Sequence, residues 1–158
     1  MFAEKYKIVP ILASENIGSG LDCDSIDMSG FHRATFIFTC ATIVTDLAFT
    51  PTSGITEGVK TTAVPSRRAV GGAIIGTATA GSTTSCDVLS AWTSHASTHA
   101  MTASDNLMYV IVVDASDMTD GEEWLTMTLA TATSGFVHCV AILEPRYSSN
   151  RSGTCLKE

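Results

Sequence analysis

The chain has little charge and few of the residues that favour helices. Only 16% of its 158 residues are charged, compared with roughly 25% in an average soluble domain. It contains four Lys and nine Leu, but 22 Thr and 17 Ser. Straight-chain residues favour helices, whereas β-branched residues such as Thr, Val and Ile favour strands. The composition therefore excludes an all-helical bundle and predicts a strand-rich domain.

Basic residues are also scarce. Nine Lys and Arg stand against 16 Asp and Glu, for a net charge of -7, and only Arg67 and Arg68 are adjacent. Because nucleic-acid affinity depends on clustered basic side chains, we expect no nucleic-acid partner. The uncharged stretch 69–86 contains four glycines and six Ser or Thr, unlike the apolar run of about 20 residues that spans a membrane. The apolar run before and after Pro10 is too short for a secretory signal. We expect synthesis and retention in a cytoplasm, with no membrane role.

No Cys-x-x-Cys spacing occurs, and the number of cysteines is odd. The five are Cys23, Cys40, Cys86, Cys139 and Cys155. This pattern predicts free thiols and indicates neither a disulfide framework nor a zinc knuckle. Cys40 and Cys139 lie in apolar runs and are expected in the core, while Cys155 lies in a polar segment and is expected at the surface.

The length predicts a single domain over residues 1–158. Within it we expect an N-terminal arm over 1–20, a β-sandwich core over 22–147 and a polar, mobile tail over 148–158. The apolar segment 6–13 contains Pro10, which fits an edge strand, or an arm lying on a neighbour, better than a central strand.

Alternating apolar residues predict the strands of the core. Residues 31–44 would place His32, Ala34, Phe36, Phe38 and Cys40 on one face. Further strands are expected at 47–50 (ended by Pro51), 69–79, 107–113, 124–131 and 136–143, with the last two forming an antiparallel hairpin. Seven or eight short strands without helical crossovers predict an all-β, antiparallel β-sandwich or jelly roll.

Residues 88–101 are ambiguous. Asp87 could cap a helix that carries Leu89, Trp92, Ala96, His99 and Ala100 on one side. The many Ser and Thr in this segment would weaken such a helix. An irregular loop with a buried Trp92 is the alternative.

Residues that could carry chemistry are present but lack the necessary patterns, so no catalytic, cofactor or metal site is predicted. His95 and His99 have the spacing of a helical metal site, without the glutamate and third ligand that such sites use. His32 and His138 are expected to be structural. The series Asp22, Asp24 and Asp27 lacks the spacing of a calcium loop. The acidic loop contains Asp114, Asp117, Asp120, Glu122 and Glu123, and these carboxylates are expected to be hydrated.

Four segments resemble small virion proteins of tailed bacteriophages. They are Asp27-Met-Ser-Gly-Phe-His-Arg-Ala-Thr-Phe-Ile-Phe38, Tyr109-Val-Ile-Val-Val-Asp-Ala-Ser-Asp-Met118, Glu123-Trp-Leu-Thr-Met-Thr-Leu129 and Val140-Ala-Ile-Leu-Glu-Pro-Arg-Tyr147. Trp124 matches the aromatic that commonly opens the third segment. Such proteins are capsid decoration, or cement, proteins that bind the outer shell, often as trimers.

The resemblance implies a non-enzymatic virion protein whose partners are the major capsid protein and copies of itself, as a homotrimer. It would be located on the capsid surface after synthesis in the host cytoplasm. The N-terminal segment Ile8–Leu12 is the first candidate for contacts beyond the protomer. The alternative is a carbohydrate- or receptor-binding β-sandwich displayed on the virion. A small hydrolase using a serine, or a cysteine such as Cys86, is the third hypothesis.

Overall fold

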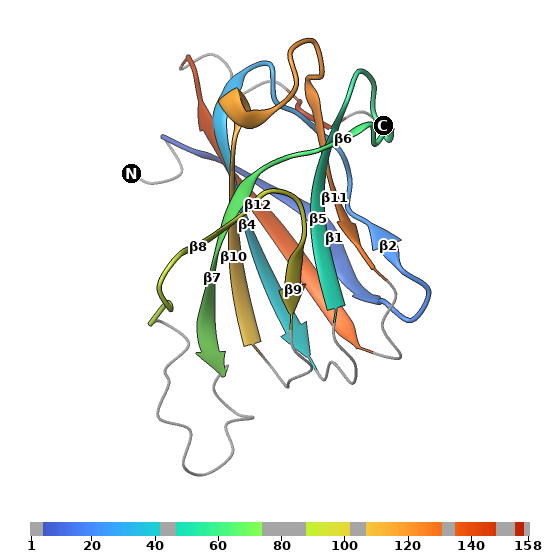
Figure 1. The fold of residues 1–158 in the computed structure, drawn as a ribbon, viewed down its shortest axis with the longest axis vertical. Coiled ribbons are helices and arrows are strands. Elements are labelled where there is room, and N and C mark those ends of the chain that lie inside the picture. The colour runs from blue at the N-terminus through green and yellow to red at the C-terminus, as the bar shows by residue number, and fades with distance from the viewer. Residues whose placement is uncertain are drawn as a thin grey trace.

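Two antiparallel six-stranded sheets pack face to face as a β-sandwich, which confirms the predicted all-β class (Figure 1). The computed structural model describes residues 5–41, 47–73, 88–101, 107–130, 135–147 and 154–156. These residues include one short 3-10 turn, η2 (Ala115–Asp117), and no α-helix. None of the described residues forms a helix with the length and hydropathy to cross a membrane.

Sheet A is the more continuous of the two sheets. Its strands lie in the order β1 (Lys7–Asn16), β12 (Phe136–Pro145), β4 (Phe31–Ala41), β10 (Leu107–Asp114), β7 (Ser66–Ala73) and β8 (Thr93–His95). Sheet B has the order β2 (Leu21–Asp22), β11 (Trp124–Leu129), β5 (Leu47–Gly54) and β6 (Thr62–Ala63). In addition, β3 (Ile26–Asp27) pairs with β11, and β9 (His99–Met101) pairs with β5.

The core lies between the sheets and comes from alternate residues of each long strand. Phe36 and Phe38 of β4 are fully buried, as is Phe49 of β5. The rings of Phe38 and Phe49 lie 4.5 Å apart, and Tyr109 of β10 packs on Phe49 at 5.8 Å. Each large apolar side chain buried in this way contributes about 1.5–3 kcal/mol. The predicted period-two patterns therefore determine which face of each strand points inward.

The prediction that His32 of β4 points inward is wrong. His32 is exposed, and Phe31 is buried in its place. The pairing of β4 with β12 has a register shift between the Glu144 and Pro145 partners, Arg33 and Phe31. A bulge of this kind lets two residues oppose one, so the alternation changes face at the strand's first residues.

Pro51 does not end its strand as predicted, because β5 continues to Gly54. The carbonyl of Pro51 accepts a hydrogen bond from the Val64 amide at 2.9 Å, on the side away from β11. In an antiparallel strand the N–H and C=O of one residue point the same way. The position of the N–H group that Pro51 lacks is therefore on the side away from β11, in the gap between β9 and β6. The pairing of β5 with β11 loses no hydrogen bond there.

The predicted hairpin between residues 124–131 and 136–143 is wrong, although both strands are present. The first is β11 in sheet B, paired with β5. The second is β12 in sheet A, paired with β1 and β4. The chain thus crosses between sheets at the place where a tight turn was expected.

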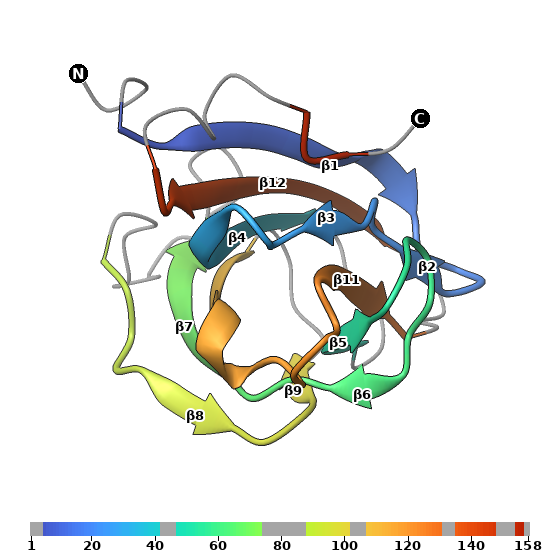
Figure 2. The same ribbon diagram turned by 90° about the horizontal axis from the view of Figure 1, so that it is seen from above.

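Residues 88–101, which we call the strap, contain no helix. The strap contributes β8 to sheet A and β9 to sheet B, and Figure 2 shows these two strands on the same side of the sandwich, linked by a short bend. Trp92 is 50% exposed, so neither the helix nor the loop with a buried tryptophan is observed. Asp87 lies outside the described residues.

The N-terminal segment is an edge strand of sheet A, one of its two predicted forms. β1 pairs with β12 from Lys7 to Asn16, with two register shifts that follow Pro10 and Leu12. Near the other terminus, the Cys155 carbonyl accepts the Asp27 amide at 2.9 Å. Cys155 is only 4% exposed, which corrects the prediction of a surface thiol.

Candidate functional site

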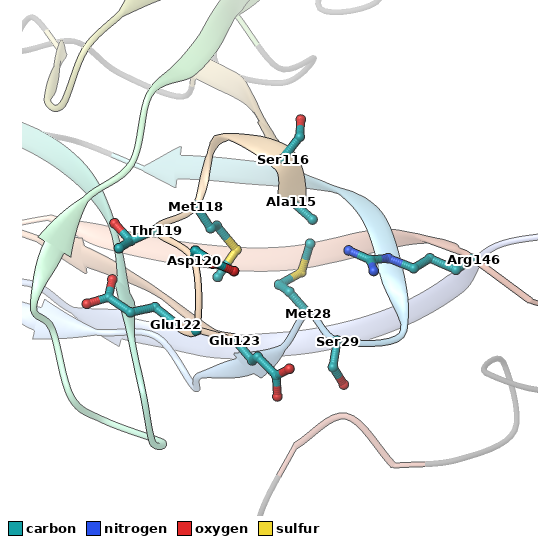
Figure 3. A pocket seen from close by; sticks show the side chains of 11 residues that line it. Met28, Ser29, Ala115, Ser116, Met118, Thr119, Asp120, Glu122, Glu123 and Arg146 are labelled. Carbon is teal, nitrogen blue, oxygen red and sulfur yellow. The ribbon is translucent and has the colours of Figure 1, made fainter.

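One end of the sandwich is hollowed by a pocket of about 380 Å³. Its walls are the loop from η2 to β11, the turn before β4 and the end of β12. The lining residues are Met28, Ser29, Ala115, Ser116, Met118, Thr119, Asp120, Gly121, Glu122, Glu123 and Arg146. Figure 3 shows Met28 and Met118 near the centre of the view, with Arg146 on one side, Glu122 on the other and Glu123 below Met28. The pocket therefore combines an apolar thioether floor with charges of both signs.

Glu122 is the buried member of the acidic loop, which corrects the expectation that all five carboxylates are hydrated. Its side chain is 8% exposed. The Ser53 hydroxyl donates to one carboxylate oxygen at 2.5 Å, and the Thr62 hydroxyl donates to the other at 3.3 Å. These partners come from β5 and β6, so Glu122 links the acidic loop to sheet B.

A second hollow of about 510 Å³ adjoins the pocket and shares Ala115, Ser116 and Arg146 with it. Here Asp114 bonds the guanidinium groups of Arg33 at 2.5 Å and Arg67 at 3.2 Å. The pKa of Arg33 is raised by the hydrogen bond and charge of Asp114. This end of the sandwich offers paired charges and two thioethers, an arrangement suited to binding a polar or charged group.

A second polar cluster lies between the sheets, where the strap crosses from one to the other. The Ser66 hydroxyl of β7 lies 2.6 Å from Nε2 of His99 on β9, and both residues are buried. The His95 and His99 rings are 4.3 Å apart. Arg68 of β7 donates to the Ala100 carbonyl. We call Ser66, Arg68, His95 and His99 the seam cluster.

The seam cluster brings together the two histidines that the sequence singled out, on strands instead of a helix. No group of three His, Cys, Asp or Glu suited to a metal exists among the described residues. Burial lowers the pKa of His99 to about 4, with further lowering from His95 and Arg68. The neighbouring guanidinium would also repel a cation. The cluster is therefore a poor metal site.

Sequence reasoning missed the contact between Ser66 and His99, which are 33 residues apart and belong to no motif. A serine beside an imidazole is the basis of nucleophilic catalysis, where a third group orients the imidazole. Here Nδ1 of His99 has no partner among the described residues. Ser66 is 5% exposed and His99 fully buried. The pair links the two sheets, and a substrate has no access to it.

The cysteines of the described residues are free and buried. Burial raises the pKa of Cys40 to about 12. It also raises the pKa of Cys139, beside the Cys23 thiol, and that of Cys155. Thiols with raised pKa values are poor nucleophiles, so the predicted structural role fits these residues. Cys86 lies outside the described residues.

The remaining candidates are dispersed over the sandwich. Asp22 bonds Lys60 at 2.6 Å and Thr128 at 2.7 Å, and the Asp27 carboxylate accepts the Ser29 amide at 2.9 Å. These aspartates stabilise strand ends and turns. His138 is half-buried in β12.

The outward face of sheet A carries apolar side chains in its middle strands. Val140, Ile37 and Val110 form one row across β12, β4 and β10. Ile142, Thr35 and Val112 form the next row, and Pro10 and Ile8 of β1 extend the two rows. An outward sheet face is usually polar when it meets water. We call these eight residues the sheet A face.

Comparison with known proteins gives no match to a family model, to a curated protein or to a solved structure.

Proposed function

We propose that this protein is a non-enzymatic virion protein that decorates and stabilises a phage capsid. It binds the major capsid protein as an oligomer, a homotrimer. The observation that carries the proposal is the sheet A face. Ile8 and Pro10 of its β1 part are exposed, its residues on β4 and β12 and Val112 of β10 are half-buried, and Val110 is 8% exposed. Contiguous apolar side chains on an outward face are characteristic of interaction sites.

Three features of the sheet A face support binding to other protein chains. It lies on the long central strands, which hold it rigid, so association orders few side chains. Its one polar side chain is the hydroxyl of Thr35, and charged residues, which would be costly to bury, are absent from these eight positions. The ion pairs of Arg33 with Asp114 and Glu144 lie at one end of these strands. Protein–protein interfaces commonly have a polar rim of this kind around an apolar centre.

The four segments that resemble decoration proteins also meet in space. Segments 27–38, 109–118 and 140–147 include much of β4, β10 and β12, which are neighbours in sheet A. Segment 123–129 contains β11, which pairs with β3 at the start of segment 27–38. Met28, Met118, Glu123 and Arg146, one from each segment, all line the end pocket. The resemblance therefore concerns one continuous part of the molecule, which supports its use in the proposal.

Co-purification with assembled particles tests the proposal. The protein should be present in purified virions, and particles that lack it should lose resistance to heat and chelation. Ile37→Lys places a charge at the centre of the sheet A face and should weaken particle binding about tenfold or more, the effect of losing about 1.4 kcal/mol. Ile55→Lys is the matched control, because Ile55 is 67% exposed in the turn after β5, and it should bind normally. Absence from virions, or equal binding of the two variants, would refute the proposal.

A virion-displayed carbohydrate- or receptor-binding module is the second candidate, and the exposed Trp92 favours it. Val88 and Leu89 are exposed beside it on the strap, and an exposed aromatic can stack on a sugar ring. Loss of glycan binding in Trp92→Ala, with particle binding absent in the wild type, would favour this module over decoration.

A further inference from the structure

The strap joins the two sheets along one side of the sandwich. Its first part lies against β7, where the Ser90 amide donates to the Val70 carbonyl at 2.8 Å and the Val70 amide donates to the Ser90 hydroxyl at 2.9 Å. Its last part pairs His99 with Phe49 of β5. Between β8 and β9 the chain crosses from sheet A to sheet B in three residues, 96–98. Any change in the seam cluster therefore acts on the link between the sheets.

The seam cluster is incompletely satisfied. The buried side-chain nitrogens without a hydrogen-bond partner within the described part of the chain are Arg68 Nε, His95 Nε2 and His99 Nδ1. All three belong to this one cluster. Buried polar groups in proteins are nearly always paired, and each exception costs about 1–3 kcal/mol. The strap is therefore held by a contact of limited stability.

Protonation of His99 would weaken the contact between the strap and β7. A neutral imidazole needs one donor and one acceptor contact, whereas an imidazolium has two N–H groups that need acceptors. The Ser66 hydroxyl can accept from Nε2 of His99, but no described group accepts from Nδ1. A second proton on His99 would therefore be buried without a partner.

The charges that face His99 are positive. Arg68 of β7 and His95 of β8 both disfavour its charged form. β5 contributes no titratable side chain, and β10 contributes Tyr109, which packs on Phe49. Arg67 of β7 pairs with Asp114. Among the described residues the His99 side chain contacts Ser66 and His95 and no carboxylate, so nothing there offsets an added proton.

We propose that the seam cluster is a pH-operated clamp: neutral His99, bonded to Ser66, holds the strap across the two sheets, and protonation of His99 releases the strap while the rest of the sandwich stays folded.

The expected size follows from proton linkage. In the closed strap the pKa of His99 is about 4, and its ordinary value is 6.5. The closed state then binds fewer protons than the open state, so opening becomes more favourable as the pH falls from 6.5 towards 4. For this group alone, opening should increase about 30-fold between pH 7.5 and pH 5.0.

Hydrogen exchange of the full chain, followed by mass spectrometry and corrected for intrinsic rates, tests the clamp. Peptides from 93–101 should lose about 30-fold of their protection at pH 5.0, while peptides from β4 and β12 keep theirs. His99→Gln can still bond Ser66 but cannot take up a proton, so its strap should have equal protection at both pH values. His138→Gln, on β12, is the matched control and should respond like the wild type.

Arg68→Gln provides an independent variant if His99→Gln does not fold. It keeps His99 and removes a fixed positive charge, so the loss of strap protection between pH 7.5 and pH 5.0 should be smaller than in the wild type, whatever the lost hydrogen bond to the Ala100 carbonyl does at both pH values. The clamp is refuted if wild-type strap protection is the same at both pH values, if β4 and β12 lose protection together with the strap, or if His99→Gln responds to pH like the wild type. Loss of the pH response in His138→Gln would also refute it.

Discussion

Glu122 at the pocket end and His99 at the seam are both buried ionisable residues, but their surroundings differ. Glu122 has a hydroxyl donor for each carboxylate oxygen, from Ser53 and Thr62. His99 has one hydroxyl partner, Ser66, and an unpartnered Nδ1. Both residues connect segments that are distant in sequence, so the difference lies in how completely each is satisfied.

This difference separates a permanent link from a conditional one. A fully satisfied buried network stabilises a single arrangement, whereas a partly satisfied one is weak. The acidic loop is thus fixed to sheet B by the two hydroxyl contacts of Glu122. The strap is fixed by His99 only while that side chain is neutral.

The largest expected effect comes from removing the satisfied link. Glu122→Ala leaves the hydroxyls of Ser53 and Thr62 without their acceptor, and hydrogen bonds to charged groups contribute about 1.5–3 kcal/mol each. The free energy of unfolding should fall by about 3 kcal/mol, measured by urea denaturation at pH 7. Glu123→Ala, at the exposed neighbour, should change it by less than about 0.5 kcal/mol. Equal losses in the two variants would contradict the network.

Acidification should weaken the conditional link. The pKa of His99 in the folded protein, about 4, lies below its ordinary 6.5, so the unfolded state binds more protons. The stabilisation is complete above pH 6.5 and is lost as the pH falls towards 4. At pH 5 this loss is about 2 kcal/mol, or a decrease in Tm of roughly 4–8 °C for a chain of this size.

Calorimetric measurement of Tm between pH 7 and pH 5, on the wild type and two variants, sharpens the comparison. His99→Gln should flatten the Tm profile between pH 7 and pH 5. Glu122→Ala should lower Tm at pH 7 and keep the slope due to His99. A slope that survives in His99→Gln would assign the pH dependence to another group.

The strands of this fold could be predicted where the signal is local. β4, β10, β11 and β12 have period-two alternation within their own residues, and all four are present near the predicted bounds. The pairing of these strands could not be predicted in the same way, because β11 and β12 are consecutive in sequence yet belong to different sheets. Alternation specifies a buried face and does not specify a neighbour.

The polar clusters depend on contacts that the sequence does not reveal. Glu122 meets Ser53 and Thr62 from positions 69 and 60 residues away. It lies among five carboxylates in ten residues, and this local density predicts hydration. His95 and His99 were singled out for a helical spacing, but they lie on strands, where Ser66 completes the contact. Only the strand pairing brings these residues together.

A matched pair of serine variants compares the two links directly. Ser53→Ala removes a donor to a carboxylate, and Ser66→Ala removes the partner of a neutral imidazole. Charge-assisted hydrogen bonds are roughly twice as strong as neutral ones. At pH 7 Ser53→Ala should therefore be more destabilising than Ser66→Ala by about 1 kcal/mol, measured by urea denaturation. The reverse order would mean that the seam, and not the acidic loop, is the stronger link.

The smallest effect is expected at an ion pair that belongs to neither cluster. Burial raises the pKa of Asp22, but hydrogen bonds from Lys60 and Thr128 and the Lys60 charge outweigh it and lower the pKa below 3.8. The pair therefore stabilises the fold above that pH and loses its effect as the pH falls further. The Lys60 and Asp22 side chains are 36% and 46% exposed, so water and salt screen the pair. Lys60→Ala should cost less than about 1 kcal/mol at low ionic strength and almost nothing in 1 M salt. A larger, salt-independent loss would show that partial exposure does not weaken this ion pair.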